Sequence, residues 1–386
     1  MDKTVITDAL IRLRDYIERE NYSGFDPYDA LNSPLFTYPF FKSNKLIRFG
    51  IQQFVKRSPV NLRPLLKVRK GVNPVTLGLC IQGYTAIGIA GLQTLSEVEV
   101  RCESLILQLE KMIPAKYHGA CWGYDFDWEA RKASIPAYQP TIVATGIITN
   151  ALYKYYKFSG SQKAFALCKS ACEFLLNDLN QSKIHDGICF SYSPNDHSKV
   201  FNASMKGVRL LSQVYHETGE LRYKESATNG MKYVIANQQN DGSWFYDHSG
   251  KGKWVDNYHT GYILDCMNDY QLLTGDNQYI EYIRKGFKYY SENLFEDNFI
   301  PKFFNTSRYP LDCTAAAQSI LTLCRFDHPQ RAAQTAHYTI QQMQSPEGNF
   351  YFRKYKNFTE KHAFMRWSDA WMFAALATVL QKFQEK

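Results

Sequence analysis

The chain has 386 residues, of which 45% are hydrophobic and 15% aromatic, and its formal net charge is +8. This composition can bury a large core and excludes a disordered or collagen-like chain. Nine cysteines, an odd number without framework spacing, argue against a disulfide-stapled secreted domain and favour a reducing compartment.

The first predicted element is an amphipathic helix over residues 5–20. It begins close to the first methionine, without the apolar run and small-residue cleavage site of a signal peptide. We therefore expect a cytoplasmic protein. A connection over residues 22–74 follows, in which Pro27 and Pro34 prevent continuous helix and a short helix is expected at 45–56.

The excess positive charge is confined to that connection. No Asp or Glu lies between Ala30 and Ser96, whereas nine Lys and Arg residues lie between Lys42 and Lys70, and the remainder of the chain has a net charge of −1. The stretch 42–70 favours an anionic partner: an acidic glycan, a lipid-linked oligosaccharide, or an anionic membrane surface with peripheral attachment at the inner membrane. A solvated basic face explains the charges equally well. No nucleic-acid recognition module is present, so no nucleic-acid partner is expected.

Six apolar segments restart along the chain at similar intervals, with spacings of 65, 63, 54, 56 and 54 residues. A second, amphipathic segment lies between each pair. Self-similarity of this kind, with two helices per unit, is typical of stacked helical hairpins that bury their apolar faces only against neighbours. The apolar segments begin near Pro74, Gln139, Asn202, Asp256, Asp312 and Arg366.

The apolar segments are rich in Ala, Gly, Thr, Cys and Leu around most of their circumference, which is typical of helices buried on most sides. Six such helices in parallel, surrounded by six amphipathic ones, form an (α/α)6 toroid. We therefore predict an all-α fold with a single (α/α)6 toroid domain over residues 1–386 and short β-hairpins in the loops. The N-termini of the inner helices then share one face, where we expect the functional site.

Two turns carry a motif that suits this architecture. Gln238-x2-Asp241-Gly242-Ser243-Trp244 and the weaker Gln344-x2-Glu347-Gly348-Asn349-Phe350 resemble the repeat motif of triterpene cyclases, which ties the end of an outer helix to the next turn. With these motifs and its repeat, the chain resembles the six-hairpin toroid superfamily. That superfamily holds glycosidases and uronate lyases on one branch and terpenoid cyclases and prenyltransferases on another, so the resemblance implies a fold and not one activity.

Two further segments resemble particular groups of proteins. Asp312-Cys313-Thr314-Ala315 is similar to the protonating element of sterol-forming cyclases, although Ala316 replaces the acidic residue that follows there and those cyclases have two helical domains. The segment 24–33 resembles bacterial prenyltransferase-like proteins encoded with exopolysaccharide and capsule synthesis. This second resemblance implies a polysaccharide-biosynthesis context.

The densest group of reactive side chains lies at residues 118–128, before the second inner helix. Asp125 and Asp127 stand among Trp122, Tyr124 and Trp128. Acids beside aromatic faces can protonate a glycosidic oxygen or activate water while the rings stack a sugar. We therefore predict the two acids as catalytic and the three aromatic residues as substrate-binding. In the alternative interpretation the acids cap a helix or bind solvent.

A second group begins the fourth inner helix. Asp256 is expected to cap that helix, and Tyr258 and His259, in its first turn, are predicted catalytic acids or bases. A purely structural histidine is the alternative. Arg366 and Asp369, one turn apart, pair with each other in the simplest interpretation. The other predicted substrate-binding residues are Tyr138, Tyr192, Asn202, Trp254, Asn257, Asp312, Arg366 and Asp369.

No phosphate loop, nucleotide fingerprint, nucleophile elbow or zinc-helix motif is present, so no cofactor and no metal are predicted. The leading hypothesis is a glycan-active protein of cell-envelope or exopolysaccharide biosynthesis. It would act on an acidic polysaccharide or lipid-linked glycan as a hydrolase, lyase or epimerase. Two alternatives stay open: a non-catalytic glycan-binding or scaffold protein of a polysaccharide assembly complex, and a terpenoid cyclase or prenyltransferase-like enzyme.

Overall fold

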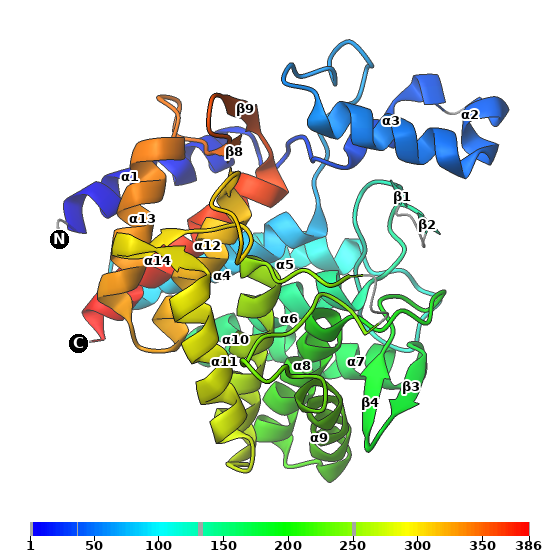
Figure 1. The fold of residues 1–386 in the computed structure, drawn as a ribbon, viewed down its shortest axis with the longest axis vertical. Helices are drawn as coiled ribbons and strands as arrows, with labels where there is room; N and C mark the ends of the chain where they lie inside the picture. Colours follow the sequence, from blue (N-terminus) through cyan, green and yellow to red (C-terminus); the bar gives the residue numbers. More distant parts are fainter. Residues whose placement is uncertain (1–2, 37, 130–133, 249–251, 386) are drawn as a thin grey trace.

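Helices dominate the computed structural model, which describes residues 3–36, 38–129, 134–248 and 252–385 (Figure 1). Six inner helices follow one another around a closed ring, because each contacts the next and the last contacts the first. The predicted (α/α)6 toroid is confirmed. The inner helices are α4 (Pro74–Ile89), α6 (Ile142–Ser159), α8 (Phe201–Thr218), α10 (Asn257–Thr274), α12 (Cys313–Arg325) and α14 (Trp371–Gln384).

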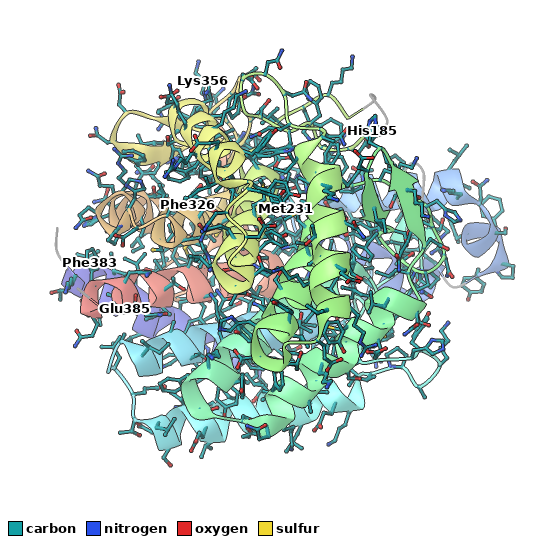
Figure 2. The ribbon with its side chains drawn as sticks, turned by 90° about the horizontal axis from the view of Figure 1, so that it is seen from below. His185, Met231, Phe326, Lys356, Phe383 and Glu385 are labelled. Atoms are coloured by element: carbon teal, nitrogen blue, oxygen red, sulfur yellow. The ribbon has the colours of Figure 1, made fainter. Side chains whose placement is uncertain are left out.

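An outer helix packs against each inner helix. The first five inner helices are each followed by their outer partner, whereas the last, α14, packs against the N-terminal helix α1. Figure 2 shows Phe326, Phe383 and Glu385, at the ends of α12 and α14, on one side of the molecule and His185 on the other. The outer helices are α1 (Lys3–Arg19), α5 (Leu95–Lys111), α7 (Gln162–Asn177), α9 (Leu221–Ile235), α11 (Ile280–Asn293) and α13 (Pro329–Met343).

The ends of the inner helices follow from local sequence. Four of them start after an Asn, Thr or Asp whose side-chain oxygen accepts a backbone N–H of the first turn. Three end at a glycine in the left-handed conformation, as the Ser-Gly and Thr-Gly pairs predict. The capping residues are Asn73, Thr141, Asp256 and Asp312, and the glycines are Gly160, Gly219 and Gly275.

The inner helices are buried on nearly all sides because a neighbour packs against each flank and an outer helix covers the back. In α4, every residue from Pro74 to Ile87 is buried. Glycine permits the close approach of α14 at this point, since a Cβ on Gly83 would lie 2.4 Å from the Phe373 ring. The most apolar stretch of the sequence is thus a ring helix. Among the described residues, no helix is long and apolar enough to cross a membrane.

The two Gln-x3-Gly turns make the same structural contact. Gln344 Nε2 donates to the carbonyls of Gly348 at 3.0 Å and of Ala9, in α1, at 2.9 Å. Gln238 Nε2 donates to the carbonyls of Gly242 and Tyr282, the latter in α11, both at 3.0 Å. Each glutamine therefore ties the end of one outer helix to the next outer helix. Through Gln344 this contact closes the outer ring between α13 and α1.

The strands are short and lie in the loops, as predicted. The named strands of the described residues pair antiparallel: two-stranded hairpins at β1–β2, β3–β4 and β5–β6, and a three-stranded sheet in the order β7-β8-β9. A π-helix, η4 (Met365–Ala370), leads into α14. The strands are β1 (Trp128–Glu129), β2 (Ser134–Ile135), β3 (Gln181–Ile184), β4 (Gly187–Phe190), β5 (Phe295–Glu296), β6 (Ile300–Pro301), β7 (Leu311–Asp312), β8 (Tyr351–Lys354) and β9 (Thr359–Ala363).

The connection between α1 and α4 extends to one side of the ring (Figure 1). It contains the short helices η1 (Asp29–Asn32), η2 (Pro34–Phe36) and α2 (Pro39–Ser43), followed by α3 (Lys45–Arg57), which confirms the helix expected at 45–56. Several of its basic side chains pair within the chain, while the side chain of Lys42 lies outside the described set. The ion pairs are Arg48 with Asp127 and Glu129, Arg63 with Asp29, and Lys70 with Glu20. That the whole chain folds as one domain stays a prediction.

Candidate functional site

The segments that precede the inner helices meet at one end of the ring. Tyr28 contacts Trp128 and Trp367 at ring-centroid distances of 6.2 and 5.8 Å, and Trp367 contacts Tyr258 at 6.1 Å. These aromatic residues come from the segments before α4, α6 and α14 and from the first turn of α10. Residues distant in sequence thus share one surface, which we call the N-terminal face.

A buried ion pair lies at this face. Arg366 donates Nε to Asp26 Oδ2 at 2.6 Å and Nη2 to Asp26 Oδ1 at 2.9 Å, and neither side chain is more than 7% exposed. The guanidinium also lies over the Tyr124 ring, 4.9 Å from its centroid. The simple pairing of Arg366 with Asp369 is wrong, because the π-helix directs the two side chains to different partners. The arrangement places one fixed positive charge beside the carboxylates of the face.

Asp125 borders the same narrow crevice as Asp26 and Arg366, and we call these three residues the acid crevice. Asp125 Oδ1 accepts a hydrogen bond from Asn73 Nδ2 at 2.5 Å. Burial, and then the neighbouring Asp26 carboxylate, raise the pKa of Asp125 to about 6. A carboxyl group with this pKa is partly protonated near neutral pH and can therefore donate a proton as well as accept one.

His259 and Asp256 form a second group at this face, with a geometry that can support proton transfer. Nδ1 of His259 lies 2.6 Å from Asp256 Oδ2, and the backbone N–H of His259 donates to Asp256 Oδ1 at 2.9 Å. The carboxylate is 3% exposed and the imidazole 19%. Asp256 thus caps α10, as predicted, and also orients the imidazole, which leaves Nε2 for proton transfer. We call this pair the His–Asp dyad.

Aromatic rings surround the dyad. Tyr246 stacks on Trp254 with centroids 4.9 Å apart and contacts His259 at 4.7 Å. Tyr258 contacts His259 at 4.1 Å, and burial, followed by the Asp256 carboxylate, raises the pKa of the Tyr258 phenol above its usual range. Trp254 remains 42% exposed. An exposed indole face beside a proton-transfer pair suits the stacking of a sugar ring.

Four other predicted residues also lie at the N-terminal face. Trp128 contacts Tyr192 at 5.6 Å, and the hydroxyl groups of Tyr192 and Tyr124 are 3.5 Å apart. Tyr138 is 53% exposed, and its backbone N–H donates to the Tyr124 carbonyl at 2.6 Å. These rings connect the acid crevice to the dyad through Trp128, Tyr28 and Trp367.

Two predicted substrate-binding residues belong to the core. Trp122 is fully buried, and its indole Nε1 donates to the Leu109 carbonyl at 2.9 Å. Asn257 is also fully buried: its Nδ2 donates to the Leu294 carbonyl, and its Oδ1 accepts from the hydroxyl groups of Tyr290 and Ser319. Because every polar atom of these side chains has a protein partner, both residues lie outside the site.

Two predicted acids are structural in a different way. Asp312 caps α12, and its Oδ2 accepts from Arg353 Nε at 2.7 Å. Asp369 is fully buried, accepts from the Phe350 backbone N–H at 2.7 Å, and has its pKa raised well above the usual range by burial. Neither carboxylate is exposed at the face. Both carboxylates therefore stabilise the fold: Asp312 caps a helix, and Asp369 binds the backbone of a turn.

Asp127 and Asn202 are not among the described residues that line the acid crevice. Asp127 Oδ2 pairs with Arg48 at 2.8 Å and its Oδ1 accepts from the Ala137 backbone N–H, so it ties α3 to the loop after Asp125. Asn202 lies in the first turn of α8 and is 4% exposed. Its Oδ1 has no hydrogen-bond partner among the described residues. Of the predicted pair, only Asp125 borders the acid crevice.

The fold brings to the face further residues that no sequence motif indicated. Asp26 lies in a turn of the segment 24–33. In the sequence this segment stood out for its family resemblance and not for its acidic residues. Tyr28, Tyr246 and Trp367 lie in loops or in the π-helix and belong to no local motif. The one feature of the sequence that could have indicated these residues is composition, since each of them lies in an aromatic-rich stretch before an inner helix.

A scan of the sequence against protein-family models finds no match, and a search of curated proteins finds none. Solved structures do match. Cellobiose 2-epimerase from Bacillus thermoamylovorans B4167 has a TM-score of 0.67 at 10% identity, with 100% of both chains covered. An unsaturated glucuronyl hydrolase specific for heparin has a TM-score of 0.61 at 14% identity, covering 98% of this chain and 96% of its own. An alpha-mannanase from Bacteroides thetaiotaomicron has a TM-score of 0.59 at 13% identity, covering 79% and 85%. At these identities the likeness establishes the shared toroid.

Proposed function

We propose that this chain is an enzyme that acts on an acidic glycan by proton transfer at the N-terminal face. The observation that carries the proposal is the acid crevice, in which Asp125 has a pKa of about 6 at the same end of the ring as the His–Asp dyad. Solved toroids of this shape named as a sugar epimerase, a glucuronyl hydrolase and a mannanase support a sugar substrate.

The roles follow from the protonation states. Asp125, partly protonated near neutral pH, donates a proton to a leaving or ring oxygen of the sugar. His259, held by Asp256, accepts a proton from water or from carbon. Trp254 and Tyr138 offer exposed rings on which a sugar can stack. Hydrolysis, elimination and epimerisation all use such an acid and base, so the reaction type is a matter for experiment.

One experiment distinguishes these three reactions. Oligosaccharides from acidic polysaccharides are incubated with the full chain in deuterated water and followed by mass spectrometry and NMR. Hydrolysis adds water across a cleaved bond, elimination produces an unsaturated uronate that absorbs in the ultraviolet, and epimerisation places deuterium on the inverted carbon. We expect Asp125→Asn and His259→Gln to abolish turnover, while Asp186→Asn, an exposed acid in the β3–β4 turn, leaves it unchanged.

A non-catalytic glycan-binding scaffold is the second candidate. It is favoured by the pairing of charges at the face, since Arg366 is held by Asp26 and Arg353 by Asp312, each by short hydrogen bonds. The same experiment separates the two, because a scaffold would bind the glycan without changing it. The cyclase alternative has no comparable support, because Asp312 of its signature is 1% exposed and paired.

The biological setting is also a proposal. We infer a role in cell-envelope or exopolysaccharide synthesis, with a lipid-linked oligosaccharide as a substrate, from the basic connection. On α3, Leu46 and Phe54 are 81% and 69% exposed and two turns apart on one face, and Lys45 and Arg57 at the helix ends are also exposed. Exposed apolar side chains framed by positive charge suit an anionic membrane surface.

A further inference from the structure

A cavity of about 520 Å³ lies along the axis of the ring, on the side away from the N-terminal face. All six inner helices line it. Its outer rim is formed by residues in the last turns of these helices, among them Lys157, Leu272 and Lys382. Its volume is in the range of small-molecule binding sites. The cavity is therefore large enough for a ligand, and it opens at the C-terminal ends of the inner helices.

A layer of side chains separates this cavity from the N-terminal face. The floor contains the sixth residue of each of the first five inner helices and the first residue of α14, so the repeat places them at one level. Tyr262 and Trp371 in this layer have ring centroids 5.5 Å apart. On its other side Tyr262 contacts Tyr258 and His259 of the dyad, at 5.9 and 6.3 Å. The floor residues are Leu79, Ile147, Lys206, Tyr262, Gln318 and Trp371.

Three basic side chains in the deep part of the cavity have no ion-pair partner among the described residues. Lys206 is 1% exposed, and its Nζ lies 3.6 Å from the centroid of the Tyr262 ring. Neither Lys206 nor Lys154 forms a hydrogen bond or an ion pair with a residue that the structure describes. Arg209, 6% exposed, donates Nη2 to the Gly146 carbonyl, while its buried Nε has no partner within the described chain. Buried cations in native proteins are ordinarily paired.

Asp265 and Asp269 favour the charged form of Lys154 electrostatically, and Asp265 does so for Lys206, but neither carboxylate forms an ion pair with these lysines. Asp269 pairs with Arg325, and Asp265 accepts from Gln318 Nε2 at 2.8 Å. Burial, and then the positive charge of an arginine, lower the pKa of both lysines to about 7; the arginine is Arg325 for Lys154 and Arg209 for Lys206. An anion in the cavity would supply the missing partner and favour the charged form of each lysine.

The remaining lining is suited to hydroxyl groups. Asn150 Nδ2 donates to Gln82 Oε1 at 3.1 Å, and both amides line the cavity. Asp265 Oδ1 is buried and has no hydrogen-bond partner among the described residues. Amides, a free carboxylate oxygen and an aromatic floor are the groups that bind sugar hydroxyls and stack a sugar ring.

We propose that this C-terminal cavity binds a small polyhydroxylated anion, a sugar that carries a carboxylate or phosphate group, through Lys154, Lys206 and Arg209. The site is distinct from the acid crevice and the dyad, and it does not depend on the proposed catalytic function.

The test is binding to the full chain, measured by calorimetry and by the shift of Tm at millimolar ligand. The probes are glucuronate, glucose 6-phosphate and inorganic phosphate, with neutral glucose as the uncharged control. We expect glucuronate or glucose 6-phosphate to bind at least about tenfold more tightly than glucose, because a charged hydrogen bond in a buried site contributes that much. Tighter binding of glucuronate identifies a carboxylate ligand, and tighter binding of glucose 6-phosphate identifies a phosphate ligand.

Two variants locate the binding. Lys206→Met keeps the side-chain length while removing a buried charge, so it should weaken anion binding about tenfold or more without lowering Tm. We expect Lys154→Met, at a less buried position, to weaken anion binding in the same way. This variant provides the test if Lys206→Met does not fold. Lys232→Met, exposed on the outer helix α9, is the matched control and should bind as the native chain does. Anion binding that survives both cavity substitutions, equal binding of glucose, or no binding of any anion would overturn the proposal.

Discussion

Arg366 and Asp26 are 340 residues apart in the sequence and form a bidentate, buried ion pair at the N-terminal face. The pair joins the π-helix before the last inner helix to the segment that follows the first helix of the chain. The face therefore exists only when the ring is closed. The same contact holds Asp26 near Asp125 and so contributes to the raised pKa of Asp125.

Breaking that pair should destabilise the fold strongly. We expect Arg366→Met to lower the free energy of unfolding by about 3–5 kcal/mol, because it leaves Asp26 as an unpaired buried charge. The double variant Asp26→Asn/Arg366→Met should recover part of the loss. Urea unfolding measures both. Arg284→Met, which removes an exposed pair with Glu281, is the control and should change stability by less than about 1 kcal/mol. Equal effects of the two arginine substitutions would contradict the role of burial.

Asp125→Asn should increase stability at neutral pH. The pKa of Asp125 is raised by folding to about 6, so the folded chain binds more protons than the unfolded chain between about pH 4 and 6. The contribution of Asp125 to stability should therefore fall as pH rises through this window, and the variant should lack that contribution. We expect a gain of about 1–3 kcal/mol at pH 7 that disappears near pH 4. Asp186→Asn should show no such gain, and a loss of stability for Asp125→Asn at pH 7 would refute the raised pKa.

Substitutions of the two members of the dyad should differ in their effects on the free energy of unfolding. Asp256→Ala removes the cap of α10 and should lower the free energy of unfolding by about 1–2 kcal/mol. His259→Gln keeps the cap and should change it by less than about 1 kcal/mol. Thermal or urea unfolding measures both. A large loss for His259→Gln would mark the imidazole as a packing residue of the aromatic cluster.

Binding of the basic connection to anionic vesicles should depend on salt. We expect cosedimentation with vesicles rich in phosphatidylserine to weaken as ionic strength rises, and each of Lys45→Gln and Arg57→Gln to remove about 1 kcal/mol of binding free energy. Phe54→Ser should weaken binding further. Leu221→Ser, on the outer helix α9 and 64% exposed, is the apolar control. If binding depends neither on salt nor on these substitutions, the basic connection is only a solvated basic face and not a membrane-binding surface.

Gln344→Leu should loosen the closure of the outer ring. The substitution removes the hydrogen bonds to Ala9 and Gly348 and the acceptor of Arg12, and we expect a loss of about 1–3 kcal/mol. Hydrogen exchange should accelerate in α1. Gln238→Leu removes the equivalent bonds between α9 and α11 and should leave exchange in α1 unchanged, so equal effects there would count against a local closure contact.

The ring could be predicted from patterns along the chain. The repeat, the Ala- and Gly-rich inner segments and the capping residues act locally or between neighbours in the chain, so their pattern can be recognised without a structure. The same holds for the Gln-Gly turns, whose glutamine bonds to a carbonyl four residues away. Helix caps such as Asp256 could therefore be predicted, and so could the shared face on which the segments before the inner helices meet.

The surroundings of each polar side chain depend on tertiary contacts that no local pattern reveals. Asp125 and Asp127 are two residues apart, yet one borders the acid crevice beside Asp26 and the other pairs with Arg48. Trp122 has the same aromatic signal as Trp254, but it is buried against Leu109 while Trp254 is exposed. The cavity at the opposite end could not be predicted from the sequence, because Lys154 comes from α6 and Lys206 and Arg209 from α8, and no local pattern shows that the three line one enclosed space. Pairing, burial and enclosure depend on contacts between distant segments, and those exist only once the ring has closed.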